Sequence, residues 1–73
     1  RDEKGVVLLK VEAGSAAEEA KLRKGDVIQE IDAKKVANIN DFNKIAPTIK
    51  PGATVLLFIN RGGQKFYTAI KAP

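Results

Sequence analysis

Two helix-start signals divide this chain into short segments. Ser15 is followed three residues later by Glu18, and Asn38 is followed in the same way by Asp41. Each pair joins a capping residue to an acidic residue that can close the first turn of a helix. Because strand-like apolar runs surround both signals, the sequence predicts strands interrupted by two brief helices.

The ends of both helices are also predicted. The first helix is expected to run to about Leu22 and to bury a stripe made of Ala16, Ala17, Ala20 and Leu22. Pro47 has no N–H for the helical ladder, so the second helix is expected to end or kink near Ala46.

Apolar runs predict strands over residues 5–11, 26–31, 54–59 and 65–71, with a brief strand around Val36. The run over 5–11 is almost continuously apolar, which predicts a strand buried on both faces for most of its length. The last run alternates, so Phe66, Thr68 and Ile70 are expected to share one face. Between the last two strands, Gly62-Gly63 predicts a hairpin turn.

The resulting order is strand, helix, strand, short strand, helix and hairpin, which is typical of a small α+β domain. We expect two helices to cap a partly open antiparallel β-barrel or sandwich. The chain has 73 residues, which suits a single domain over 1–73. It has no cysteine, so apolar packing must supply its stability.

The composition argues against catalysis and cofactors. The chain has no histidine and no cysteine, which removes most nucleophile–base pairs and the usual zinc and haem ligands. Its acidic residues form neither a calcium loop nor a marked pair across a cleft. We therefore expect a non-catalytic domain without a metal or cofactor.

The charge and hydropathy patterns limit the classes of partner that this chain can be expected to bind. The net charge is +4, from 13 Lys+Arg and 9 Asp+Glu, but the cations are spread along the chain. Nucleic-acid binders usually concentrate such charge and interleave it with aromatic residues, so we expect no nucleic-acid partner. No apolar run approaches the roughly 18 residues of a membrane span, so we expect no membrane insertion by this segment.

The corner Gly25-Asp26 lies between a basic helix end and a strand, and it could be a reactive site or a structural joint. Glycine adopts backbone conformations that other residues reach only at a cost, and aspartate caps nearby N–H groups. We therefore interpret the corner as a structural joint, since this role accounts for both residues.

The stretch "GVVLLKVEAGSAAEEAKLRKGDVIQEIDAKKVANINDFNKIAPTIKPGATVLLFINRGG" resembles a PDZ domain, in particular the type found in bacterial HtrA/Deg serine proteases. Five features match in order: an apolar strand, the helix start in "GSAA", the "LRKGDVI" turn into a strand that ends in Asp32, a capped helix with Phe42 on its inner side, and "PGATV" before the final hairpin. The resemblance covers nearly the whole chain.

This resemblance implies that peptide or protein C-termini, or extended peptides, bind in a groove and add to the sheet as an extra strand. The residues implied to line the groove are Ile39, Asn43 and Ala46 on the second helix and Val6, Val7 and Leu8 on the first strand. For the helix, the alternative stays open that Ile39 and Ala46 extend the core stripe while Asn43 is solvated.

The chain departs from the family pattern in three places. No carboxylate loop of the Gly-Leu-Gly-Phe type is found, so we expect the fold to lack the strand that carries it; that element could precede Arg1, follow Pro73 or not exist. Lys21 stands where the family usually has a left-handed glycine, which predicts roughly 1 kcal/mol of strain. Ala33 also replaces a usual glycine, which suggests a different turn type.

The resemblance further implies a regulatory or substrate-recognition domain of an HtrA-like serine protease, with the protease domain as a partner and a periplasmic or other extracytoplasmic location. Two other roles remain open. An apolar, unpaired edge at residues 6–11 could pair with another chain, as a structural or weakly homo-oligomeric domain. The lysine-rich face could bind an anionic surface or nucleic acid weakly and in a salt-dependent manner.

Overall fold

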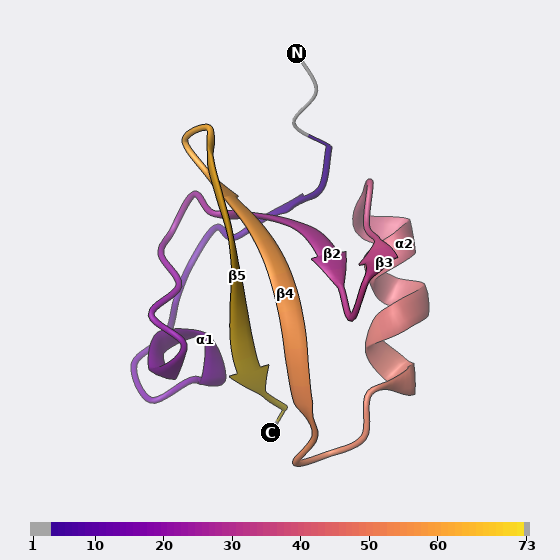
Figure 1. Ribbon diagram of the computed structural model, residues 1–73. Coiled ribbons are helices and arrows are strands. Elements are labelled where there is room, and N and C mark those ends of the chain that lie inside the picture. Colours follow the sequence, from indigo (N-terminus) through magenta and orange to yellow (C-terminus); the bar gives the residue numbers. More distant parts are fainter. Residues whose placement is uncertain (1–3, 73) are drawn as a thin grey trace.

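Antiparallel strands in the order β1-β2-β4-β5, with β3 beside β2, form the sheet of this protein (Figure 1). The computed structural model describes residues 4–72. The helix α2 lies beside β3, and α1 lies near the end of β5 (Figure 1). The elements are β1 (Val6–Val7), α1 (Ala16–Glu19), β2 (Val27–Ile31), β3 (Lys34–Lys35), α2 (Ile39–Ile45), the 3-10 turn η1 (Ala46–Thr48), β4 (Thr54–Arg61) and β5 (Gln64–Lys71). The predicted α+β arrangement is confirmed.

Both predicted helix caps are present. The Ser15 side chain accepts a hydrogen bond from the Glu18 backbone N–H at 3.2 Å, and the Asn38 side chain accepts one from the Asp41 N–H at 2.9 Å. The acidic partners reach one residue further back than the capping box predicts. Glu18 accepts from the Gly14 N–H, and Asp41 accepts from Ala37.

The two helices end for different reasons. α2 stops at Ile45, and η1, which contains Pro47, follows it, as the sequence predicts. α1 stops at Glu19, earlier than the predicted Leu22. Lys21 has the left-handed φ of 64° that the sequence predicts, and this residue turns the chain so that Leu22 enters the core.

The prediction of a long first strand buried on both faces is wrong. β1 contains only Val6 and Val7, although the backbone of Leu8 continues the pairing with Gly25 and Asp26, just before β2. The side chains of Val7 and Leu9 are 49% and 77% exposed, while Val6 and Leu8 pack against the core. The run is apolar on both faces, but no strand of the described residues lies beyond β1 in the sheet.

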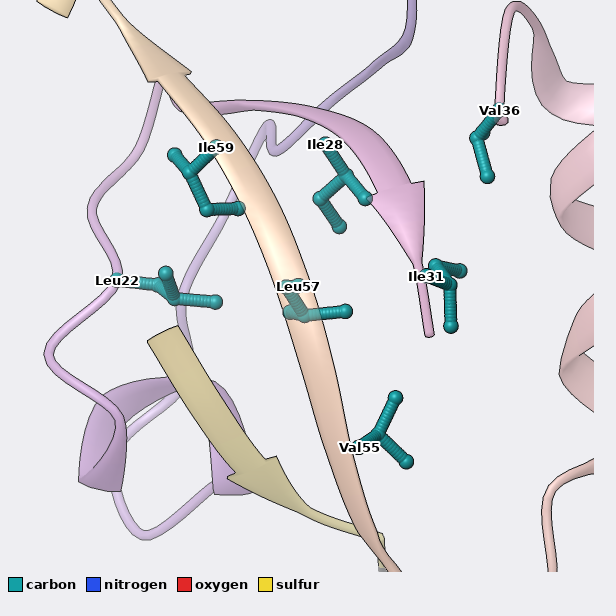
Figure 2. Packing of buried hydrophobic residues seen from close by; sticks show 7 residues of the cluster. All are labelled: Leu22, Ile28, Ile31, Val36, Val55, Leu57 and Ile59. Atoms are coloured by element: carbon teal, nitrogen blue, oxygen red, sulfur yellow. The ribbon is translucent and has the colours of Figure 1, made fainter. Parts of the chain in front are cut away.

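The core occupies one face of the sheet. Side chains from β2 and β4 point into it, with Leu22 and Val36 contributed by the flanking segments (Figure 2). On β5, Phe66, Thr68 and Ile70 are half-buried while the residues between them are exposed, which confirms the predicted alternation. The buried apolar residues are Leu22, Ile28, Ile31, Val36, Val55, Leu57 and Ile59.

Two tight turns join the strands. Gly62 and Gly63 have φ of 58° and 94° and form the predicted hairpin turn between β4 and β5. Between β2 and β3, Asp32 and Ala33 have φ of 50° and 68°, which is the type I′ pattern. Ala33 therefore keeps the positive φ that favours glycine.

Candidate functional site

The Gly25-Asp26 corner contains the most buried acidic group among the described residues. Asp26 is 1% exposed, and its carboxylate receives two hydrogen bonds of 2.8 Å from the Arg61 guanidinium and one of 2.9 Å from the Arg23 N–H. The Arg61 guanidinium also donates to the Lys21 carbonyl oxygen and lies 4.8 Å from the centre of the Phe66 ring. These hydrogen bonds join the end of β4 to the turn between α1 and β2.

The hydrogen bonds from Arg61 lower the pKa of Asp26 below its ordinary value, against burial, which acts to raise it. The same bonds raise the pKa of Arg61. Both groups therefore stay charged near neutral pH, and neither is poised to exchange a proton there. The corner is a structural joint, as the sequence predicts, but its arginine partner was not predicted because it lies 35 residues away.

An apolar cavity is the site best suited to receive another molecule's side chains. Its volume is about 230 Å³, and no polar surface lines it. Small-molecule pockets usually span about 300–1,000 Å³, so this cavity is better suited to one or two apolar side chains. It lies over the inner face of the sheet, between Leu8 beside β1 and Phe42 of α2.

The outer edge of β1 is open beside this cavity. β1 pairs with β2 on one side and ends the sheet on the other. The N–H and C=O of Leu8 both bond toward β2, to Asp26 and Gly25 at 2.8 and 2.7 Å. Backbone groups alternate in direction along an extended segment, so those of Val7 and Leu9 point to the open side. Leu8 links the two features, because it lies between these residues and also lines the cavity.

The structure places the predicted groove residues in two separate regions. Val6 and Leu8 pack against the core, Leu8 lines the cavity, and Val7 is exposed at the open edge. None of the three predicted α2 positions lines the cavity. Ile39 is 55% exposed, Asn43 is exposed, and Ala46 is half-buried in η1.

The helix-side walls of the cavity are instead Phe42 and Ile49. Of the two, Phe42 was predicted to lie on the inner side of the second helix, and so in the core. Core and cavity walls share the same helical spacing, so the pattern could find these residues but could not identify them as lining a cavity.

Residues 4–72 contain no group of three or more acidic, histidine or cysteine side chains that could hold a metal ion. No helix in this range is long and apolar enough to cross a membrane.

The sequence of this chain is similar to those of known proteins. The family model described as PDZ domain matches residues 1–71. A probable periplasmic serine protease of Haemophilus influenzae, named do/HhoA-like, is 35% identical over 68 residues, which are 93% of this chain and 14% of the relative. A probable periplasmic serine endoprotease of Chlamydia trachomatis, named DegP-like, is 30% identical over 71 residues, which are 97% of this chain and 14% of the relative. The chain thus spans only a small part of these relatives.

Solved structures with similar folds come from related proteins. The PDZ domain of an SdrC-like protein from Listeria monocytogenes matches with a TM-score of 0.82 and 28% identity, over 93% of this chain and 70% of that one. The HtrA-type protease AlgW, solved with a decapeptide, matches with a TM-score of 0.78 and 29% identity, over 92% of this chain and 21% of that one.

Proposed function

Since this chain belongs to the PDZ domain family, we propose that it binds an extended peptide segment as an added strand beside β1. The observation that carries this proposal is the apolar cavity next to the open edge of β1. The edge offers backbone hydrogen bonds, and the cavity offers a place for alternate side chains. Strand addition of this kind combines main-chain affinity with side-chain selection.

The geometry of an added strand fits both features. Side chains along a strand alternate between its two faces, so every second residue of a segment paired with Val7 and Leu9 would point toward the cavity side of the sheet. There the segment would meet Leu8, Phe42 and Ile49. The exposed face of α2 that carries Ile39 and Asn43 would form the outer wall, with Ala46 at its end.

In this proposal the domain is one part of a larger protein. The relatives named as periplasmic serine proteases contain such a domain as a small part of their length. We place this chain in an HtrA-like protease, where its peptide-binding surface recognises substrates or regulates the protease domain. The location would then be periplasmic or otherwise extracytoplasmic.

Substitutions at Leu9 test the binding mode. Leu9 is exposed, so its side chain can be changed without disturbing the core, and a proline there removes the N–H that points to the open side. We expect Leu9→Pro to weaken binding of short valine- and isoleucine-rich peptides by about tenfold or more, since their main-chain bonds provide much of the affinity. Leu9→Ser keeps the N–H and is expected to bind within about threefold of the unmodified protein.

Backbone amide shifts in a titration followed by NMR measure this effect and locate it. Binding at the proposed site shifts the amides of Val7, Leu9 and Phe42, with either free or amidated peptide ends. Equal affinities of the proline and serine variants, or a varied peptide set that shifts none of these amides, would refute strand addition at β1.

A structural role is the second candidate, because the same edge exposes apolar Val7 and Leu9. An exposed apolar edge strand invites pairing with another chain. In this case the domain would form weak homo-oligomers through β1, and Leu9→Pro would dissociate them. Sedimentation that shows a monomer at high protein concentration excludes this candidate.

A further inference from the structure

A second exposed surface lies on the opposite face of the sheet from the core. On β4 the side chains of Val55 and Leu57 are buried, while Leu56 between them is 45% exposed. The neighbouring β5 contributes Tyr67, which is 58% exposed. Burial alternates along both strands, so this surface and the apolar cavity lie on different faces.

Aromatic and aliphatic side chains form the centre of this outer surface. Phe58 and Tyr67 are directly opposite each other across the two strands, and their ring centres are 4.7 Å apart. Leu56 and Ala69 form the next pair on the same face. Phe58 also lines a hollow of about 340 Å³ that extends toward β3. We call Leu56, Phe58, Tyr67, Ala69 and this hollow the outer patch.

Cations outnumber anions around the outer patch. Lys4 and Lys35 line the hollow, and Lys65 and Lys71 follow the exposed alternation of β5. The acidic residues here are Glu30, which lines the hollow, and Asp32, whose carboxylate accepts a 2.8 Å hydrogen bond from the Leu56 N–H. Among residues 4–72, four lysines therefore accompany two carboxylates, and the carboxylate of Asp32 already has a backbone partner.

We propose that the outer patch docks a polypeptide segment with one large apolar or aromatic side chain flanked by carboxylates. The anchor side chain would enter the hollow and stack against Phe58 and Tyr67, the kind of rigid aromatic contact that dominates many interfaces. The flanking carboxylates would pair with Lys35 and Lys65. Opposite charges across an interface direct encounter and suppress wrong partners.

Charge and shape together argue against three other occupants: a second copy of this chain, a membrane surface and a nucleic acid. A second copy of this chain would bring identical lysines face to face. A flat membrane surface would not fill the concave hollow. Nucleic-acid phosphates would meet the carboxylate of Glu30 inside the hollow. An acidic peptide segment with a single anchor satisfies both the shape and the charge.

Synthetic peptides test this proposal on the whole chain. The probe is a short peptide of glutamate, serine and glycine with one central tryptophan, compared with versions in which serine replaces the tryptophan or lysine replaces the glutamates. We expect the first probe to shift the amides of Leu56, Phe58 and Tyr67, and both altered probes to bind at least about tenfold more weakly.

Variants of the chain complete the test. Tyr67→Ser removes an exposed contact and Lys65→Glu reverses a charge, and each is expected to weaken the first probe by at least about tenfold. Leu9→Ser, an exposed apolar substitution at the β1 edge, is the matched control and leaves its affinity unchanged. The failure of peptides at the β1 edge would not affect this result, because the reporting amides are different.

Three outcomes would overturn the proposal. The first is no binding of the acidic tryptophan peptide. The second is amide shifts centred on Val7, Leu9 and Phe42. The third is that anionic lipid vesicles or a single-stranded oligonucleotide shift the outer-patch amides while the peptide does not.

Discussion

At the scale of single residues, Asp26 holds together more of the fold than any other polar side chain described. Its carboxylate binds Arg61 at the end of β4 and the turn that follows α1. Its backbone carbonyl accepts a 2.8 Å hydrogen bond from the Leu8 N–H beside β1. A single residue thus positions the open edge relative to the sheet. The proposed peptide site depends on this corner without containing it.

Replacing Asp26 with asparagine should remove a pH-dependent part of the stability. The folded pKa of Asp26 is lowered, so its contribution is present above the ordinary aspartate pKa and is lost as the pH falls through the folded value. At pH 7 we expect Asp26→Asn to lower the free energy of unfolding by about 1–3 kcal/mol, as for other lost hydrogen bonds to charged groups.

Urea denaturation between about pH 2 and pH 7 measures both parts of this prediction. The two proteins should differ most at neutral pH and converge at the acidic end. Other carboxylates contribute equally to both proteins, so the difference between the curves reports Asp26. A constant difference at every pH would contradict the prediction.

At the scale of elements, β1 is short but closely fitted to β2. Gly5, just before β1, has a φ of 152°. A Cβ atom at this position would clash with the Ile28 carbonyl oxygen and would lie 2.7 Å from a Val27 methyl carbon. Only glycine permits this approach without a shift of the backbone. The position of β1, and with it the open edge, therefore depends on a missing side chain.

Gly5→Ala is expected to destabilise the protein by more than Gly14→Ala does. Both glycines have positive φ, but a Cβ atom on Gly14 has no neighbour within 4 Å. Alanine at Gly14 should therefore cost only the conformational strain, about 1 kcal/mol, while alanine at Gly5 adds the steric clash. Thermal denaturation compares the two, and amide exchange at Leu8, whose N–H bonds to the Asp26 carbonyl, should rise in Gly5→Ala alone. Similar stabilities of both variants would show that β1 can shift at little cost.

At the scale of the whole molecule, the apolar cavity leaves one side of the core open to solvent. Leu57 and Ile70 from the hairpin and Phe42 from α2 all line it. Apolar side chains that face such an open cavity have no packing partners on that side. A small chain without disulfides has little stability to spare. An added strand that fills the cavity would therefore increase both the packing and the stability of the domain.

Peptide binding at β1 should raise the melting temperature by an amount that grows with the logarithm of the free peptide concentration above its dissociation constant. A ligand that binds only the folded state stabilises it by about 2.7 kcal/mol at a concentration one hundred times its dissociation constant. Differential scanning calorimetry with and without the valine- and isoleucine-rich peptide measures this effect. Leu9→Pro should show no increase under the same conditions, and a similar increase in this variant would indicate binding elsewhere.

The order of the elements, both helix caps, the end of α2 and the final hairpin were predictable from the sequence. Each depends on residues within a few positions of one another. Ser15 with Glu18 and Asn38 with Asp41 are such local pairs, and Pro47 acts on its own helix. The left-handed Lys21 was predicted by a different route, from its place in the family pattern.

The tertiary structure alone decided the length of β1, the partner of Asp26 and the walls of the cavity. Each depends on segments that are distant in sequence: Arg61 reaches Asp26 from the end of β4, and Leu8 meets Phe42 across the cavity. The spacing of apolar residues shows which side chains face away from water. This spacing is the same for side chains that pack against one another and for side chains that line a cavity. Only the packing of the helices and strands distinguishes core residues from cavity walls.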